Sequence, residues 1–265
     1  MEKEILNMEE AANLFGVSIK TFIKLLKEEN VPARKIGREW RFSKSALIDW
    51  LSHGNSKDYS SSEQDTRQYF EQVAGKWEEI SGQYYDSSII NKIIDSDILK
   101  ENMTVLDYGA GDGFISRGIA SCVRKIIAMD TSGSMLDELE RKAKSQGIVN
   151  ILTVECDVNE VPLRSAAVDL ICASMILHHI EEPRELITEF YRVLKAEGIL
   201  FIADFLPYED EVFKNNMHDF HMGLDPIALE KWLIDIGFCN ITIEKMPDKR
   251  DKNIFVLTAS KVYSE

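Results

Sequence analysis

The pattern of apolar and polar residues changes at about residue 103. Beyond that point, short apolar runs alternate with segments whose apolar residues recur at helical spacing. The apolar runs span residues 103–108, 125–130, 150–155, 168–174, 198–204, 240–245 and 254–260, and the helical segments lie near 114–122, 133–146, 183–195 and 226–236. Continuous apolar runs are typical of strands buried on both faces, and alternation with helices is typical of parallel strands. The pattern therefore predicts an α/β fold, with a doubly wound, mainly parallel seven-stranded sheet flanked by helices.

The first fifty residues have a different pattern, which predicts two short helices. Asn7 followed by Glu10 resembles a capping box and indicates a helix through about Phe15. Ser18 can cap a second helix with an apolar side at helical spacing. The solvent side of this second helix carries Lys20, Thr21, Lys24 and Lys27.

The segment after these helices predicts a hairpin and a third helix. Pro32 ends the second helix, and residues 34–42 alternate about Gly37 and Arg38. Ser43 can cap a last helix through Leu51. The sequence therefore predicts a winged helix-turn-helix, in which the hairpin is the wing.

This unit resembles the winged helix-turn-helix of excisionase and mercury-resistance-regulator proteins. In that family the second helix enters the major groove of DNA and the wing contacts phosphates. The resemblance implies DNA contacts from five residues, Lys20, Thr21, Lys24, Arg38 and Arg41. The alternative is a solvated basic face without a partner. One such module buries only about 600–1,000 Å² on DNA, so useful affinity calls for a homodimer or a helper protein.

Charge and composition divide the chain in the same way. Residues 1–54 carry a charge of about +1, so almost all of the net charge of −14 lies in the remainder, which would repel a polyanion. A polar, serine-rich stretch between the two parts is typical of a flexible tether. We expect a DNA-binding domain at residues 1–53, a linker at 54–66 and a second domain at 67–265.

A glycine-rich loop follows the first apolar run of the second domain. Residues 105–113 read Val-Leu-Asp-Tyr-Gly-Ala-Gly-Asp-Gly, and Asp130 ends the next apolar run. Such a loop brings backbone N–H groups against a nucleotide-like ligand, while the second carboxylate can accept hydrogen bonds from a ribose. A dinucleotide fingerprint would require glycine at position 114, where this chain has Phe114.

The loop resembles the cofactor loop of class I S-adenosylmethionine (SAM) dependent methyltransferases. Further segments resemble motifs of the same family in the same order. They are the ribose-binding turn at 128–136, the adenine-binding strand end at 155–158, the fourth strand at 169–174, and the pattern of the small-molecule, quinone-biosynthesis branch at 177–180 and 190–198. The family usually has Pro-Gly where this chain has Glu197 and Gly198.

The resemblance implies that SAM is the cofactor and suggests a role for each contact. Gly109 and Gly111 admit the methionine and ribose against bare backbone, and Asp107 orients the loop or the amino group of the ligand. Asp130 accepts from the ribose hydroxyls, and Asp157 accepts from the adenine amino group. The other expected cofactor contacts are Ala110, Thr131, Met135, Val158 and Ser174. An aspartate at a strand end can instead stabilise a turn or cap a helix.

Four residues are candidates for catalysis. His178 and His179 follow the fourth predicted strand, His221 precedes the helix near 226, and Tyr85 belongs to a segment that folds over the cofactor as a lid in this family. Methyl transfer needs a base only when the acceptor atom carries a proton. A histidine with ordinary structural partners is the alternative for each imidazole.

Several classes of function are disfavoured. The Pro-Pro-aromatic and Pro-Cys turns of nucleic-acid base methyltransferases are missing after the fourth strand, where the chain reads Ser-Met-Ile-Leu. His178, His179 and the four scattered cysteines lack metal-ligand spacing, so we expect no metal. The apolar stretches are too short to cross a membrane. Together with the unpaired cysteines, this indicates a cytoplasmic protein.

The sequence thus supports a SAM-dependent methyltransferase that acts on a small molecule and carries a DNA-binding module of regulatory type. The alternative is a transcription regulator whose methyltransferase-like domain senses SAM or a metabolite without turnover. Methylation of a nucleic acid delivered by the first domain is a third, less favoured possibility.

Overall fold

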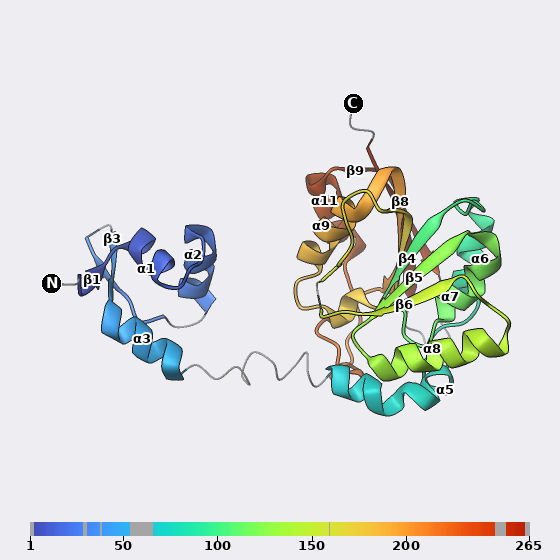
Figure 1. Ribbon diagram of the computed structural model, residues 1–265, viewed down its shortest axis with the longest axis horizontal. Coiled ribbons are helices and arrows are strands. Elements are labelled where there is room, and N and C mark those ends of the chain that lie inside the picture. Colours follow the sequence, from blue (N-terminus) through green and yellow to red (C-terminus); the bar gives the residue numbers. More distant parts are fainter. Residues whose placement is uncertain are drawn as a thin grey trace. The chain divides into compact units, whose positions relative to one another are not determined.

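The computed structural model describes residues 3–28, 31–37, 39–53, 66–158, 160–246 and 253–262. The chain forms two compact units, residues 1–61 and residues 62–265, which are described separately below (Figure 1). None of the described helices is both long enough and apolar enough to span a membrane.

The first unit packs three helices on a small antiparallel sheet. Its strands are β1 (Ile5–Leu6), β2 (Arg34–Ile36) and β3 (Glu39–Ser43), in the order β1-β3-β2. Its helices are α1 (Met8–Leu14), α2 (Ile19–Glu28) and α3 (Lys44–His53). The predicted helices and the wing hairpin are confirmed. The two-residue strand β1 was not predicted, because only its pairing with β3 defines it.

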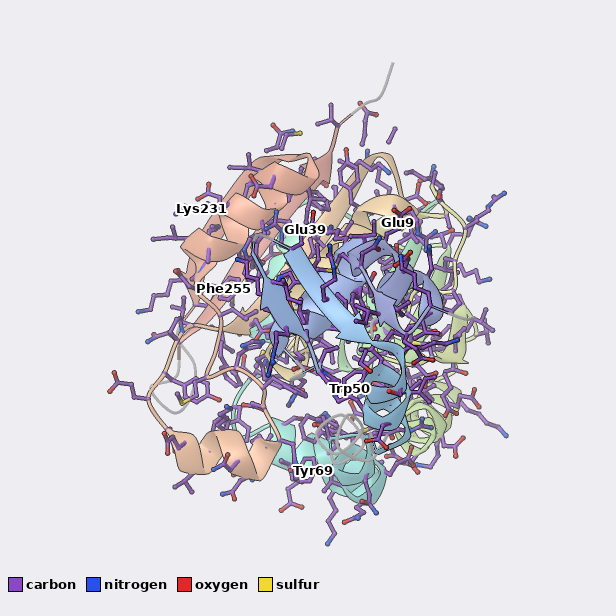
Figure 2. The ribbon with its side chains drawn as sticks, turned by 90° about the vertical axis from the view of Figure 1, so that its left-hand side faces the viewer. Glu9, Glu39, Trp50, Tyr69, Lys231 and Phe255 are labelled. Atoms are coloured by element: carbon purple, nitrogen blue, oxygen red, sulfur yellow. The ribbon has the colours of Figure 1, made fainter. Side chains whose placement is uncertain are left out.

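The caps and the core of the first unit follow from its sequence. The Asn7 side chain accepts a hydrogen bond from the Glu10 N–H and the Glu10 carboxylate accepts one from the Asn7 N–H, each at 2.9 Å, so the predicted capping box is present. Phe22 of α2 and Phe42 of β3 are fully buried, with ring centroids 5.2 Å apart. Trp50 of α3 and Glu39 of β3, which belong to this unit, are labelled in Figure 2.

The second unit is built on a seven-stranded sheet with the order β6-β5-β4-β7-β8-β10-β9. The strands are β4 (Thr104–Tyr108), β5 (Lys125–Asp130), β6 (Ile151–Glu155), β7 (Val168–Ser174), β8 (Leu194–Phe205), β9 (Phe238–Met246) and β10 (Ile254–Lys261). Each of the seven predicted apolar runs is a strand. The first five are parallel, whereas β10 lies antiparallel between β8 and β9.

Helices cover both faces of this sheet (Figure 1). The residues of β5 alternate between the two faces, with Ile126 in the core beneath α6 (Ser88–Asp95) and α7 (Phe114–Ile119). Met129 belongs to the core beneath α9 (Pro183–Val193) and α11 (Pro226–Ile236). The helix α8 (Gly133–Ser145) packs on the first face, against Ala128. The predicted doubly wound fold is therefore confirmed.

Shorter helical segments complete the unit. Residues 66–73 are helical, and η1 (Ala74–Lys76) and α5 (Trp77–Ser81) follow them, as expected for the broken-helical segment before the glycine loop. The turn η2 (Ala120–Cys122) extends α7, and η3 (Leu177–His179) follows β7. The helix α10 (Glu211–Met217) was not predicted from the sequence.

Candidate active site

A pocket lies at the carboxyl ends of β4, β5 and β7. In the strand order, β5 and β6 lie beyond β4 on one side and β8 lies beyond β7 on the other, so the chain changes direction at the β4–β7 pair. Doubly wound sheets bind their ligands at this kind of switch point. The expected cofactor residues that line the pocket are Asp107, Gly109, Ala110, Gly111, Asp130, Thr131, Met135, Val158 and Ser174.

Asp130 holds the glycine loop and the following turn together. Its Oδ2 accepts a hydrogen bond from the Gly111 N–H at 2.8 Å, and its Oδ1 accepts one from the Ser132 N–H at 2.9 Å. Each carboxylate oxygen has a second lone pair, so both can still accept from a ribose hydroxyl. Burial raises the pKa of Asp130, and the backbone N–H groups oppose that rise.

Asp107 is tied to the start of α7. Its Oδ2 accepts hydrogen bonds from the Ser116 N–H at 3.0 Å and the Ser116 hydroxyl at 2.6 Å. Burial raises the pKa of Asp107 to about 6, although these two hydrogen bonds favour the ionised form. A buried carboxylate with a raised pKa at the pocket wall is suited to a cationic ligand.

Two glycines of the loop adopt a left-handed backbone conformation, and one of them also has no room for a side chain. Gly109 has a φ of +69°, and a Cβ at this position would lie 2.4 Å from Cγ1 of Ile176. Gly111 has a φ of +53°, and a Cβ there would lie 3.7 Å from the indole nitrogen of Trp77. Both positions therefore favour glycine through their positive φ, and Gly109 also through its close approach to Ile176.

Asp157 is the one expected cofactor residue that does not line the pocket. Its side chain is 80% exposed, and its Oδ1 lies 4.0 Å from the guanidinium of Arg67. Its neighbours Cys156 and Val158 line the pocket instead. The turn after β6 thus directs this carboxylate toward solvent and Arg67, which the sequence pattern did not reveal.

The segment before the sheet covers the pocket. We call residues 66–85 the covering segment. Within it, the residues that line the pocket are Thr66, Arg67, Phe70, Trp77 and Tyr85. Tyr69, labelled in Figure 2, belongs to the helix at its start. Burial raises the pKa of the Tyr85 phenol, so its hydroxyl stays protonated.

Ion pairs and caps fasten the covering segment to α8. Glu71 accepts hydrogen bonds from the Ser134 hydroxyl and N–H, which belong to the first turn of α8. The ammonium of Lys142, on the same helix, lies 2.7 Å from Glu78 of the covering segment and 2.6 Å from Asp112 of the glycine loop. These contacts link residues far apart in sequence, and sequence reasoning missed them.

The four candidate catalytic residues do not all reach the pocket. His179 and Tyr85 line it, whereas His178 and His221 do not. His221 directs Nε2 at the carbonyl oxygens of Ile180 and Glu181, at 2.9 and 3.2 Å. Burial lowers the pKa of His179 well below its ordinary value, with the adjacent His178 adding to the effect, so this imidazole is neutral at pH 7.

His178 lies behind His179 in a buried polar cluster. Its Nδ1 is 2.5 Å from Oδ1 of Asp204, at the end of β8. Its Nε2 is 3.7 Å from Oδ1 of Asp219, which follows α10. Burial opposes ionisation of His178, but the pKa is raised on balance by Asp204 first and Asp219 second. Sequence reasoning missed both aspartates because no motif contains them.

The predicted DNA-binding residues lie on the first unit. Lys20, Thr21 and Lys24 are exposed on α2, although the Thr21 N–H and hydroxyl also bond to the capping Ser18 hydroxyl. Arg41 of β3 forms an ion pair with Glu39. Arg38 lies outside the described residues. Lys20, Thr21 and Lys24 therefore share one exposed face of α2, as binding of this helix in the major groove of DNA requires.

Comparison with known proteins divides the chain in a similar way. Residues 106–202 match a family model described as a methyltransferase domain, and residues 5–54 match one described as a helix-turn-helix domain. These two segments contain the glycine loop and α2, respectively.

Individual relatives match the second unit. An uncharacterised methyltransferase of Schizosaccharomyces pombe is 35% identical over 120 residues, which cover 44% of this chain and 44% of that protein. The chain spans about half the length of the Schizosaccharomyces pombe relatives that it matches. The ubiquinone biosynthesis O-methyltransferase of Actinobacillus pleuropneumoniae is 23% identical over 185 residues, 62% of this chain and 79% of that one.

A solved structure with a related fold comes from Aquifex aeolicus and is described as a SAM dependent methyltransferase. It is 25% identical to this chain, with a TM-score of 0.52, and the alignment covers 67% of this chain and 100% of that one.

Proposed function

We propose that this chain transfers a methyl group from SAM to a small-molecule acceptor. The premise is that it carries a class I SAM-dependent methyltransferase domain, which follows a helix-turn-helix domain in the sequence. One observation carries this proposal. Nine of the ten expected cofactor residues line a single pocket, and the candidate catalytic residues His179 and Tyr85 line the same pocket.

The chemistry of the pocket fits the cofactor. SAM carries a positive sulfonium and a positive amino group, and the pocket offers the carboxylates of Asp107 and Asp130, whereas that of Asp112 is paired with Lys142. Asp130 holds the ribose, and Asp107 orients the glycine loop or the amino group. Methyl transfer is an in-line displacement with a good leaving group, so alignment in a dry pocket supplies most of the rate. The covering segment excludes water from that reaction.

Two features favour a small molecule over a nucleic acid as the methyl acceptor. The covering segment encloses the pocket with aromatic side chains, and residues 174–177 contain neither the Pro-Pro-aromatic nor the Pro-Cys turn of base methyltransferases. The ubiquinone biosynthesis O-methyltransferase of Actinobacillus pleuropneumoniae also acts, by its name, on a small molecule. We take the part of the pocket lined by His179 and Phe70, whose rings are in contact, as the acceptor end.

The first unit binds DNA through α2, with the wing against phosphates, and so controls its own or neighbouring genes. Lys20 and Lys24 contact phosphates and Thr21 faces the base edges. A homodimer supplies the affinity that one module lacks. A DNA partner places the protein in the cytoplasm, where the four free cysteines stay reduced.

A second candidate function is a transcription regulator that senses SAM without turnover. Both candidates require SAM binding, so turnover distinguishes them. The test is S-adenosylhomocysteine formation by the full chain with SAM and a panel of phenolic, carboxylic and amine acceptors. Turnover above that of Asp130→Ala supports the enzyme, whereas tight SAM binding without turnover, and with SAM-dependent DNA affinity, supports the sensor. Labelled methyl incorporation into DNA or RNA would instead indicate a nucleic-acid acceptor.

A further inference from the structure

His179 is held by acceptor groups on one edge of its ring. Its Nδ1 is within hydrogen-bond distance of the carbonyl oxygen of His218, at 3.5 Å, and Oδ1 of Asp219 lies 3.2 Å from the same nitrogen as a close charge contact outside hydrogen-bond geometry. A carbonyl oxygen and a carboxylate oxygen can only accept hydrogen bonds. The arrangement therefore favours the tautomer in which Nδ1 carries the hydrogen and Nε2 carries the lone pair.

The side chain of His179 also lines the pocket. Its Nδ1 lies against Asp219 and His218, and Nε2 lies across the ring from these groups. The ring of Phe70, in the covering segment, meets the His179 imidazole edge to face with centroids 5.2 Å apart. Because Nδ1 already faces two acceptor groups, Nε2 is the nitrogen of this ring that can take a proton from a molecule in the pocket.

The surroundings fix Asp219 and His179 in this relation. The Tyr208 hydroxyl donates to Oδ2 of Asp219 at 2.7 Å. Asp204 accepts hydrogen bonds from the backbone N–H of Leu177 at 3.0 Å and from His178 Nδ1 at 2.5 Å, which pins the turn η3 that carries both histidines. Second contacts of this kind set the orientation of a catalytic imidazole.

We propose that Asp219 is a positioning residue, which holds His179 as the general base for an acceptor that carries an ionisable hydroxyl. This inference rests on the proposed function. The acceptor oxygen attacks the methyl carbon of SAM while the carbon–sulfur bond breaks and its electron pair stays on sulfur. The hydroxyl proton moves to Nε2 of His179, and the Asp219 carboxylate balances the imidazolium charge. The products are a methyl ether and S-adenosylhomocysteine.

The pocket wall also limits the body of this acceptor. The ring of Phe70 contacts His179, and the branched side chains of Ile176 and Ile180 line the same pocket. Aromatic and branched aliphatic side chains favour an apolar molecule with a ring, which they contact without leaving polar groups unpaired. The acceptor class is therefore a phenol or a related hydroxylated ring.

A bound cation is the competing explanation of the same cluster. One ligand atom each from His178, His179 and Asp219 lies within 4.8 Å of the other two, a spacing that a metal ion could use. A metal at Nδ1 of His179 would put the hydrogen on Nε2 and remove the lone pair from the pocket. Metal content and tautomer therefore separate the two explanations.

The first test needs no acceptor. ¹⁵N spectra of the full chain with S-adenosylhomocysteine should show His179 with its hydrogen on Nδ1, and purified protein should contain no stoichiometric metal. A hydrogen on Nε2, or one tightly held metal ion per chain that is lost in Asp219→Asn, would overturn the proposal. Because neither readout uses turnover, failure here is distinguishable from failure of the proposed function.

The second test uses phenols and catechols of graded acidity as probes. In Asp219→Asn we expect kcat to fall by about 10²–10⁴ for a phenol of ordinary acidity, with the Kd of SAM unchanged. The loss should be small for a phenol already ionised at the assay pH. An equal loss across the series would show a structural role and overturn the proposal.

Two further variants keep this test decisive. Asp235→Asn removes an exposed carboxylate that pairs with Arg184 on the surface, and it should leave kcat unchanged across the series. Where Asp219→Asn lowers Tm by more than a few degrees, Tyr208→Phe is the milder variant, because it removes only one hydrogen bond from Asp219. It should also lower kcat more for ordinary phenols than for ionised ones, but by a smaller factor. Loss of selectivity in Tyr208→Phe would count against the proposal.

Discussion

Gly111 donates its backbone N–H to the Asp130 carboxylate over 2.8 Å, so the residue proposed to bind the ribose also fixes the loop beneath the cofactor. The same carboxylate accepts the Ser132 N–H at the start of α8. Asp130 therefore organises the pocket before any ligand arrives. Its replacement has a structural consequence and a binding consequence, which can be measured separately.

Asp130→Ala should weaken SAM binding by about 10²–10⁴-fold, because hydrogen bonds to a charged group contribute about 1.5–3 kcal/mol each and two ribose hydroxyls lose theirs. Asp130→Asn keeps one acceptor oxygen and should lose less. Isothermal titration with SAM gives both affinities, and thermal unfolding reports the loss of the loop contact. SAM binding by Asp130→Ala at wild-type affinity would reject the site assignment.

Gly109→Ala should both destabilise the domain and abolish SAM binding. The added Cβ would lie 2.4 Å from Cγ1 of Ile176, and φ is +69°. Overpacking and backbone strain of this kind cost about 1–3 kcal/mol each, which for a domain of this size lowers Tm by roughly 2–4 °C per kcal/mol.

Gly147→Ala is the matched control for that variant. Gly147 has a φ of +71°, but nothing lies within 4 Å of a Cβ built there. It should therefore show the effect of strain without the clash, and SAM affinity should not change. Equal Tm shifts for the two variants would show that contact with Ile176 is unimportant.

SAM affinity should fall as the pH is lowered through 6. Burial raises the pKa of Asp107 to about 6 from its ordinary value, so below that pH the carboxyl group is protonated in the free protein. A cationic ligand favours the ionised carboxylate, and the affinity should decline by up to about tenfold per pH unit below 6 and level off above 7. Titrations between pH 5 and 8 measure the decline, which should flatten in Asp107→Asn.

The same shift predicts a pH dependence of folding. The folded pKa of Asp107 exceeds the unfolded value, so the folded state binds more protons and its stability falls as pH rises through the window between the two values. Asp107→Asn has no carboxyl group at this position and so lacks this contribution to the pH dependence of stability. Denaturant unfolding between pH 4 and 7 should therefore show a smaller decline for the variant, and a parallel decline would contradict the raised pKa.

Lys142→Met should lower the stability of the second unit strongly. Lys142 bridges Glu78 and the buried Asp112, and its removal leaves the Asp112 carboxylate without its nearest cation. Breaking a buried ion pair costs about 3–5 kcal/mol. Differential scanning calorimetry should show this loss, whereas Lys144→Met, at an exposed position of the same helix, should change Tm little. Adding Asp112→Asn to Lys142→Met should recover part of the stability.

The strands and the cofactor loop could be predicted from the sequence because their signals are local. An apolar run such as 168–174 must be buried wherever it lies, and a glycine at 109 or 111 indicates a turn regardless of the rest of the chain. The acidic residue at the end of the second run, Asp130, follows from the same order of motifs. All of these predictions survive in the structure, with changes of a few residues at the strand ends.

The catalytic end of the pocket could not be predicted in the same way. His178, His179 and His221 look alike in the sequence, but only His179 reaches the pocket, because η3 directs adjacent side chains to different surroundings. Asp157 ends a predicted strand like Asp130, yet its side chain lies in solvent next to Arg67. Such differences depend on the direction of side chains at turns, which the spacing of apolar and polar residues in the sequence does not predict.

By itself, the amino-acid sequence determined the order of the strands and helices along the chain, the glycine loop and the acidic residue that follows it, because each depends on neighbouring residues. Only the tertiary structure decided which distant residues meet, as Asp219 meets His179 and Glu71 meets Ser134. The physical reason is that these contacts form between side chains brought together by packing of the whole unit, and packing is a property of many residues at once.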